Sequence, residues 1–104
     1  MFYVVLTTTK DSAEAERIAK RLVDERLAAC VNVLPNISST YRWKGKVEHA
    51  REVLLFIKTS REKLDRLMAK VKELHSYEVP EILALPIESG SQEYLKWLEE
   101  SLRW

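Results

Sequence analysis

Two long segments in the middle of the chain alternate hydrophobic and polar residues with a period of two, and they meet at Lys44-Gly45. This period is typical of β-strands, and a Gly-containing turn between two such segments predicts a β-hairpin, here spanning residues 28–59. The return segment is hydrophobic on both faces only at residues 53–57. We therefore expect the inner part of the hairpin to be buried and its tip to be exposed.

The predicted hairpin is too long for a domain of this size. At ~3.3 Å per residue its first strand, residues 29–43, would extend on the order of 50 Å, or somewhat less with a bend or bulge at Pro35. A compact domain of about 100 residues has a radius of gyration of only ~13 Å. An overhanging sheet edge that carries Tyr41 and Trp43 invites pairing with another chain, which predicts a symmetric homo-oligomer built through the hairpins. The alternative is a solvated hairpin with a kink at Pro35.

A strand and a helix are predicted before the hairpin. Residues 2–8 form a continuous hydrophobic and β-branched run, typical of a central strand covered on both faces. Asp11 precedes Glu14 by the three residues of a capping box, and hydrophobic residues then recur at helical spacing up to Leu27. The charged residues of this helix are expected on its solvent-exposed face: Glu14, Arg17, Lys20, Arg21, Asp24 and Glu25.

Two helices and one strand are predicted after the hairpin. Thr59 with Glu62 repeats the capping spacing, and an amphipathic helix follows with Leu64, Leu67, Met68, Val71 and Leu74 as its hydrophobic positions. Residues 79–87 resemble a strand, but Pro80 and Pro86 each remove a hydrogen-bond donor, which confines it to a sheet edge. A terminal helix starts after residues 90–91, with hydrophobic positions Tyr94, Leu95, Trp97, Leu98, Leu102 and Trp104.

The resulting order is β-α-β-β-α-β plus a helix. This order predicts an α+β, ferredoxin-like fold with an antiparallel sheet and both main helices on one face. At 104 residues, with 46% hydrophobic and 32% charged residues, the chain is expected to be one globular domain, residues 1–104.

Charge and targeting signals bear on partners and compartment. The net charge of +1 is too small to direct the protein to nucleic acid or to an anionic membrane, so neither is expected as a partner. The first residues lack the basic and long hydrophobic regions of a signal peptide, and no segment reaches transmembrane length, which predicts a cytoplasmic protein. The single cysteine, Cys30, cannot form an internal disulfide and is expected to be a small buried residue.

Several activities of this fold are disfavoured by missing motifs. Residues 53–58 lack the RNP pattern of an RNA-recognition module, and a single Cys excludes a Cys-x-x-Cys metal site. With Gly only at positions 45 and 90, neither a P-loop nor a dinucleotide-binding motif is possible. No His-paired nucleophile motif is evident, so we expect a non-enzymatic protein without catalytic residues.

The segment after the second helix, His75-Ser76-Tyr77-Glu78-Val79-Pro80-Glu81-Ile82, holds most of the chemically versatile side chains. One imidazole, one phenol and two carboxylates within this segment are potential ligands for a divalent metal ion. The alternative is structural: His75 caps the helix C-terminus, Tyr77 packs, and the glutamates are solvated. A single His is not the ligand spacing of a metal site, so the sequence leaves both interpretations open.

Five segments together resemble the CutA family of divalent-cation tolerance proteins: residues 27–32, 39–48, 52–59, 75–82 and 94–98. The resemblance covers nearly the whole chain in the same order. It implies a ferredoxin-like homotrimer assembled through the long strands, a cytoplasmic location, and a role in tolerance of copper and other divalent ions. The expected trimer agrees with the hairpin argument, which rests on strand length.

The resemblance also implies site residues. Some family members associate copper with a cysteine after the first strand and with a pair of histidines, but those positions are Thr7 and Leu74 here, followed by His75. It implies a weaker divalent-metal site, copper being the expected ion, from His75 with Glu81 or with groups of a neighbouring subunit. A second hypothesis is a trimeric, PII-like small-ligand or signalling module with Tyr77, Glu81, Trp43 and Tyr41 at an intersubunit cleft or interface. A third is a structural trimer that anchors another protein.

Overall fold

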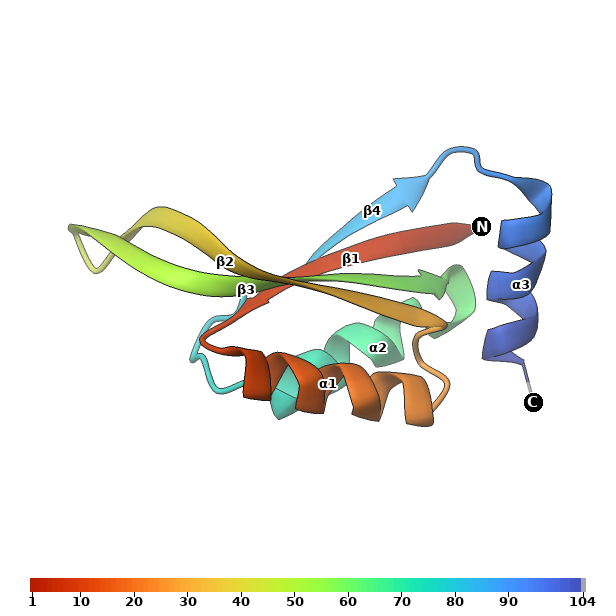
Figure 1. Ribbon diagram of the computed structural model, residues 1–104, viewed down its shortest axis with the longest axis horizontal. Coiled ribbons are helices and arrows are strands. Elements are labelled where there is room, and N and C mark those ends of the chain that lie inside the picture. The colour runs from red at the N-terminus through yellow and green to blue at the C-terminus, as the bar shows by residue number, and fades with distance from the viewer. Residues whose placement is uncertain (104) are drawn as a thin grey trace.

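The computed structural model describes residues 1–103, so Trp104, expected in the terminal helix, lies outside the described residues. Seven elements follow one another in the predicted order (Figure 1). They are β1 (Phe2–Thr9), α1 (Ser12–Asp24), β2 (Cys30–Trp43), β3 (Lys46–Ser60), α2 (Arg61–Leu74), β4 (Leu83–Ile87) and α3 (Gln92–Leu102). No helix within residues 1–103 is long and apolar enough to span a membrane.

The four strands form one antiparallel sheet in the order β2-β3-β1-β4. The sheet confirms that β1 is an inner strand and that the last strand is an edge strand, but the helices cover only one face of β1, so the prediction that it is covered on both faces is wrong for the single chain. Helices α1 and α2 lie side by side on one face, and α3 lies at one end of the sheet (Figure 1). This is the predicted α+β, ferredoxin-like arrangement. Strand β4 begins at Leu83 and not at residue 79, and residues 79–81, which precede it, line a cavity.

The hydrophobic core fills the space between the sheet and the two helices. Its fully buried members come from β1, α1, β3 and α2, and include Val5, Ile18, Leu22, Leu55 and Leu67. Leu55 lies on an inward position of the period of two predicted for the hairpin, and Ile18, Leu22 and Leu67 lie on the hydrophobic positions predicted for the helices.

The two helix starts predicted from capping spacings can be compared with the structure. Asp11 caps α1 as expected, because its Oδ1 accepts a 2.8 Å hydrogen bond from the Glu14 N–H. The prediction for α2 is wrong. The cap position is Ser60, which makes no side-chain capping bond, while the buried Thr59 donates its hydroxyl to the Leu27 carbonyl at 2.6 Å. Thr59 is an inward position of β3, and its hydroxyl therefore faces the chain that enters β2.

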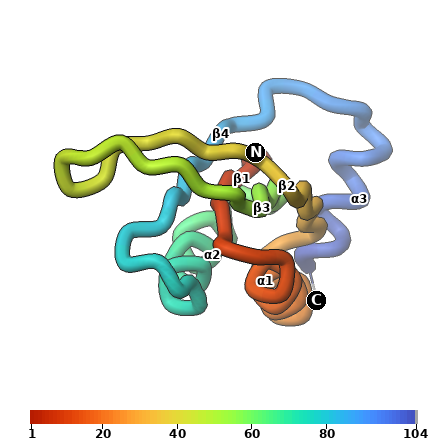
Figure 2. Tube along the Cα trace, turned by 60° about the vertical axis from the view of Figure 1, so that its left-hand side comes forward, coloured from red at the N-terminus to blue at the C-terminus, as the bar shows by residue number. Residues whose placement is uncertain are grey.

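The hairpin β2–β3 extends well beyond the helices, as predicted (Figures 1 and 2). The molecule measures 44 × 25 × 22 Å along its principal axes. A β-bulge shifts the register between Leu34 and Ile37, next to Pro35, and Asn36 has a φ of 63°. Lys44 and Gly45 have φ values of 51° and 82°, the left-handed pair that a two-residue hairpin turn with native twist requires. We call the part beyond the bulge, residues 37–52, the arm.

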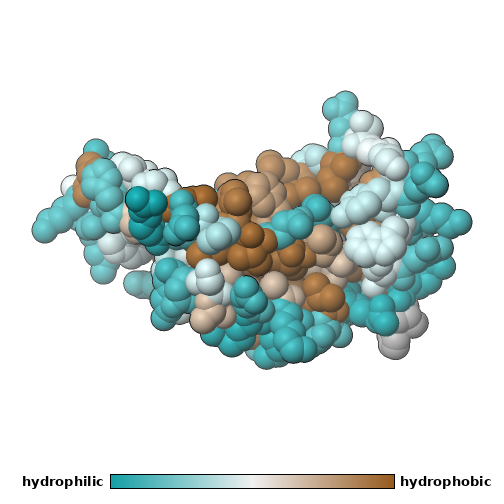
Figure 3. All heavy atoms as spheres, viewed as in Figure 1, coloured by the Kyte–Doolittle hydropathy of each residue, from teal (hydrophilic) through white to brown (hydrophobic). Residues whose placement is uncertain are grey.

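The sheet face opposite α1 and α2 is hydrophobic and largely uncovered. Alternation along each strand places Leu6, Leu54 and Phe56 on this face, all only partly buried. Leu34, Leu83 and Leu85 lie beside them on β2 and β4 and are 49%, 54% and 49% exposed. Hydrophobic atoms gather in the middle of the molecule in Figure 3. We call these six leucine and phenylalanine positions the open sheet face.

Candidate functional site

His75 ends α2 with its imidazole fully buried. Its Nδ1 accepts a 3.1 Å hydrogen bond from the Tyr77 N–H, so this nitrogen carries no proton. The other nitrogen, Nε2, lies 2.7 Å from the Thr8 carbonyl oxygen, which can only accept, so Nε2 is the protonated one. With both nitrogens occupied, this geometry leaves no lone pair for a metal ion. His75 joins the α2–β4 segment to the end of β1.

Glu14 is buried beneath the same segment, with only 1% of its side chain exposed. Its carboxylate accepts hydrogen bonds from the Ser76 N–H at 2.8 Å and from the Ser76 hydroxyl at 3.0 Å, and His75 Nδ1 lies 3.8 Å away. Burial alone would raise the pKa of Glu14, but the hydrogen bonds from Ser76 and from the Lys10 N–H outweigh it and hold the pKa below its ordinary value.

The expectation that Glu14 is solvent-exposed is therefore wrong. A signal for its burial was present in the sequence. Positions 14, 18 and 22 are spaced by four, which places Glu14 on the same helix stripe as the fully buried Ile18 and Leu22.

A cavity of about 680 Å³ lies between the arm and the α2–β4 segment. Figure 2 shows that segment passing close to the arm. We call this cavity the arm groove. Its lining residues are Thr8, Ser39, Thr40, Tyr41, Trp43, Glu52, Tyr77, Glu78, Val79, Pro80 and Glu81.

The arm groove brings together four of the five residues that the sequence singled out. Tyr41 and Trp43 lie on one wall and are 44% and 40% exposed, while Tyr77 and the exposed Glu81 lie on the other. His75 is not among the lining residues, so the structure separates it from the cavity in which Glu81 lies. The predicted pairing of His75 with Glu81 at a metal ion has no counterpart in this geometry.

Glu52 is a groove residue that the sequence did not single out. It is 8% exposed, and its Oε2 accepts a 2.7 Å hydrogen bond from the Tyr77 hydroxyl. Burial and this hydrogen bond to the Glu52 carboxylate raise the pKa of Tyr77. Tyr77 is therefore a neutral donor at physiological pH. Its ring also contacts that of His75, with centroids 4.9 Å apart.

The remaining metal-ligand positions do not complete a site within one chain. Thr7 is fully buried on the core side of β1, and its hydroxyl makes no hydrogen bond within residues 1–103. Leu74 packs against the core. Over the same residues, no three His, Cys, Asp or Glu side chains converge as a metal site requires. Cys30 is half-buried near Asn32, a correction to the prediction that it is buried.

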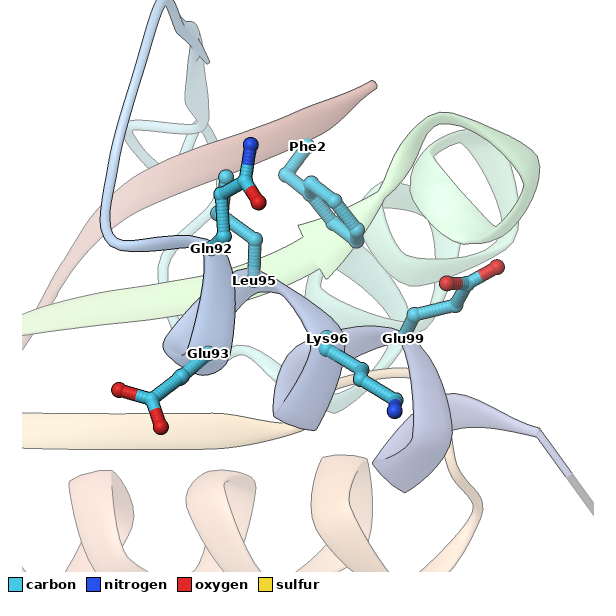
Figure 4. A pocket seen from close by; sticks show the side chains of 6 residues that line it. All are labelled: Phe2, Gln92, Glu93, Leu95, Lys96 and Glu99. Atoms are coloured by element: carbon cyan, nitrogen blue, oxygen red, sulfur yellow. The ribbon is translucent and has the colours of Figure 1, made fainter.

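A second cavity, of about 470 Å³, lies along α3. It is lined by Phe2 and five α3 residues: Gln92, Glu93, Leu95, Lys96 and Glu99 (Figure 4). The polar ends of Glu93, Lys96 and Glu99 point in different directions, so they do not converge on one ligand atom. The arm groove is therefore the better candidate for a binding site.

Comparison with known proteins places these features in a family. Residues 3–101 match the model of the CutA1 divalent ion tolerance protein family. The divalent-cation tolerance protein CutA of Thermus thermophilus is 52% identical over 98 residues, which cover 94% of this chain and 95% of the relative. The chloroplastic CutA 1 of Oryza sativa is 47% identical over 96% of this chain, but this match covers only 56% of that longer protein.

Solved structures agree with the sequence matches. The structure of the periplasmic divalent cation tolerance protein CutA of Archaeoglobus fulgidus superposes with a TM-score of 0.95 at 45% identity, covering 99% of this chain and 100% of that chain. The names of two of these relatives place them in the periplasm and in the chloroplast, so the cytoplasmic location expected here stays a prediction. The match over nearly the full chain, in sequence and in fold, shows that this protein belongs to the CutA1 family of divalent ion tolerance proteins.

Proposed function

We propose that this protein acts in divalent-cation tolerance as a non-enzymatic homotrimer that binds cations at the arm groove. The observation that carries the proposal is the lining of that groove, where Glu52, Glu78 and Glu81 supply carboxylate oxygens next to the Tyr77 phenol. Such oxygens are ligands for divalent ions. The location in the cytoplasm is part of the same proposal.

Assembly is supported by the open sheet face and the arm. A monomer would leave Leu34 on β2 and Leu83 and Leu85 on β4 about half exposed, on the sheet face that neither α1 nor α2 covers. Burying an apolar surface of this kind stabilises an assembly by roughly 25 cal/mol per Å². Adjacent copies would also contact the arm, which extends beyond the helices (Figure 1).

The trimer matters for the ion because one chain offers an incomplete site. No three potential ligands converge within residues 1–103, and His75 is committed to Thr8 and Tyr77. We therefore place Glu81, the exposed carboxylate of the groove, at the ion, with further ligands from a neighbouring copy. Copper(II) is the first ion to test. The oxygen donors of the groove also suit harder ions such as Mn²⁺.

Calorimetric titration tests this proposal. Copper(II) and Mn²⁺ are titrated into wild type, Glu81→Gln and the exposed control Glu88→Gln, in a buffer with a weak chelator that suppresses adventitious binding. We expect binding at a fixed stoichiometry per trimer and a loss of at least about tenfold in affinity for Glu81→Gln alone, since one charged ligand is removed. Equal, weak binding by all three proteins would refute the groove as an ion site.

A measurement of mass tests the assembly independently. Sedimentation equilibrium of the wild-type protein is expected to give three times the 12.2 kDa chain mass. A monomer at micromolar concentration would contradict the trimer, and it would also remove the neighbouring copy that the ion site needs.

A further inference from the structure

The lining of the arm groove contains acidic side chains but no basic ones. Its eleven lining residues include three glutamates, three aromatic residues and three Ser or Thr residues, and none of them is Lys, Arg or His. The carboxylates are Glu52, Glu78 and Glu81. With no basic partner in the groove, phosphorylated and carboxylated ligands would meet like charge. A neutral hydrophobic ligand would desolvate the carboxylates without compensation.

Glu52 has unused hydrogen-bonding capacity inside the groove. The Tyr77 hydroxyl occupies Oε2, and no hydrogen bond from within residues 1–103 reaches Oε1. A carboxylate offers about four lone-pair positions. Since Glu52 is 8% exposed, an N–H donor that reached Oε1 from the groove would form a charge-assisted bond in a poorly hydrated place.

The opposite wall is aromatic and faces a space larger than a hydrated ion needs. Tyr41 and Trp43 are partly exposed there, and the cavity of about 680 Å³ has room for a small organic molecule. Aromatic faces attract cations through their quadrupole. The Trp43 ring already attracts one, because Lys44 Nζ lies 5.6 Å from its centroid.

We propose that the arm groove binds an organic cation, a primary amine with an attached hydrophobic body. The ammonium group donates to Glu52 Oε1 and is close to Glu81, and the body rests on the Tyr41 and Trp43 rings. This inference rests on the proposed function for the location of the site. The two proposals differ in the ligand: the organic cation needs the aromatic rings of Tyr41 and Trp43, and a metal ion does not.

Three small molecules of similar size separate charge from shape: phenethylamine, 2-phenylethanol and 3-phenylpropanoate, which are cationic, neutral and anionic at pH 7. Each is titrated into the assembled, isotope-labelled protein while amide and indole N–H resonances are followed by NMR. We expect phenethylamine to bind tightest and to shift the Trp43 indole and residues 77–81, with affinity falling as salt is raised. Equal binding of the neutral alcohol, or tighter binding of the anion, would overturn the proposal.

Matched variants test which groove residues contribute to the binding of phenethylamine. Glu52→Gln removes the charge but keeps a carbonyl that can accept a hydrogen bond from Tyr77. Trp43→Leu removes one aromatic ring of the groove wall. Each variant is expected to lower the affinity for phenethylamine about threefold to thirtyfold. Glu88→Gln, an exposed change of the same charge outside the groove, is expected to have no effect. Unchanged affinity in both groove variants would refute the site.

The two proposals fail separately. If phenethylamine binds as expected and no metal does, the ion proposal fails and the organic cation site stands. If Mn²⁺ or copper(II) binds through Glu81 and none of the three organic probes shifts the Trp43 indole, the inference fails and the ion site stands. Trp43→Leu sharpens this distinction, because it is expected to affect the amine and not the metal.

Discussion

Replacing Glu14 by Ala is expected to destabilise the protein strongly, although Glu14 lies in a helix whose other charged residues are exposed. The change removes three hydrogen bonds to a buried carboxylate and leaves the Lys10 N–H and the Ser76 N–H and hydroxyl without their acceptor. Hydrogen bonds to charged groups contribute about 1.5–3 kcal/mol each, and stranded donors cost a similar amount. Because these terms overlap, we expect a loss of about 3 kcal/mol in the free energy of unfolding.

Urea denaturation at fixed protein concentration measures this loss, with Glu16→Ala as the control. Glu16 is an exposed residue of the same helix, so the control makes the same change in charge and in helix propensity. We expect Glu16→Ala to remain within about 0.5 kcal/mol of wild type. The interpretation of Glu14 as a buried anchor is refuted if the two variants lose the same small amount.

The pH dependence of the same contribution follows from the lowered pKa of Glu14. The unfolded chain, with an ordinary pKa near 4.5, takes up the proton at higher pH than the folded protein does. The stability from Glu14 is therefore fully present above about pH 4.5 and is lost as the pH falls through the folded pKa. The difference in unfolding free energy between wild type and Glu14→Gln should be constant from pH 7 to 5 and should shrink below that. A difference that grows in acid would contradict the assignment.

Three further substitutions test other parts of the structure. Val5→Asp places an unpaired charge in a fully buried position of an inner strand and should abolish folding, as judged by circular dichroism; a stable variant would refute the position of β1. Trp43→Glu adds charge to the arm and should lower the assembled mass in sedimentation, an effect that a non-interfacial arm would not show. Tyr77→Phe leaves the buried Glu52 without its donor and should cost about 1–3 kcal/mol in urea denaturation; no change would mean that the bond is not stabilising.

The order of elements could be predicted from the sequence because local periods determine it. The period of two in β2 and β3 and the spacing of three to four residues in α1 and α2 indicate which side of each element is buried. The prolines near β4 indicate that it is an edge strand. The overhang of the hairpin followed from its length alone. The bulge beside Pro35 follows the same logic, since Pro cannot donate to the sheet.

The connections within the site could not be predicted in this way because they join distant residues. Glu14 and Ser76 are 62 positions apart, and His75 and Thr8 are 67 apart. No local pattern indicates that a carboxylate will find two donors on a particular loop. The sequence singled out residues 75–82 and left His75 open between a metal ligand and a structural cap, but it assigned Glu14, the hydrogen-bond partner of Ser76, to solvent.

These long-range hydrogen bonds also bear on whether His75 can ligate a metal ion. In this chain, the Nδ1 atom of His75 accepts a hydrogen bond from the Tyr77 N–H, and the Tyr77 hydroxyl donates to Glu52, which lines the arm groove. A metal ion on Nδ1 would have to displace that N–H, and the Tyr77 wall would lose one of its two attachments. Metal ligation by His75 and an intact groove are therefore competing states of the same segment. A chain with Thr7 and Leu74 in place of further ligands gains little from the first state, which favours the groove as the functional surface.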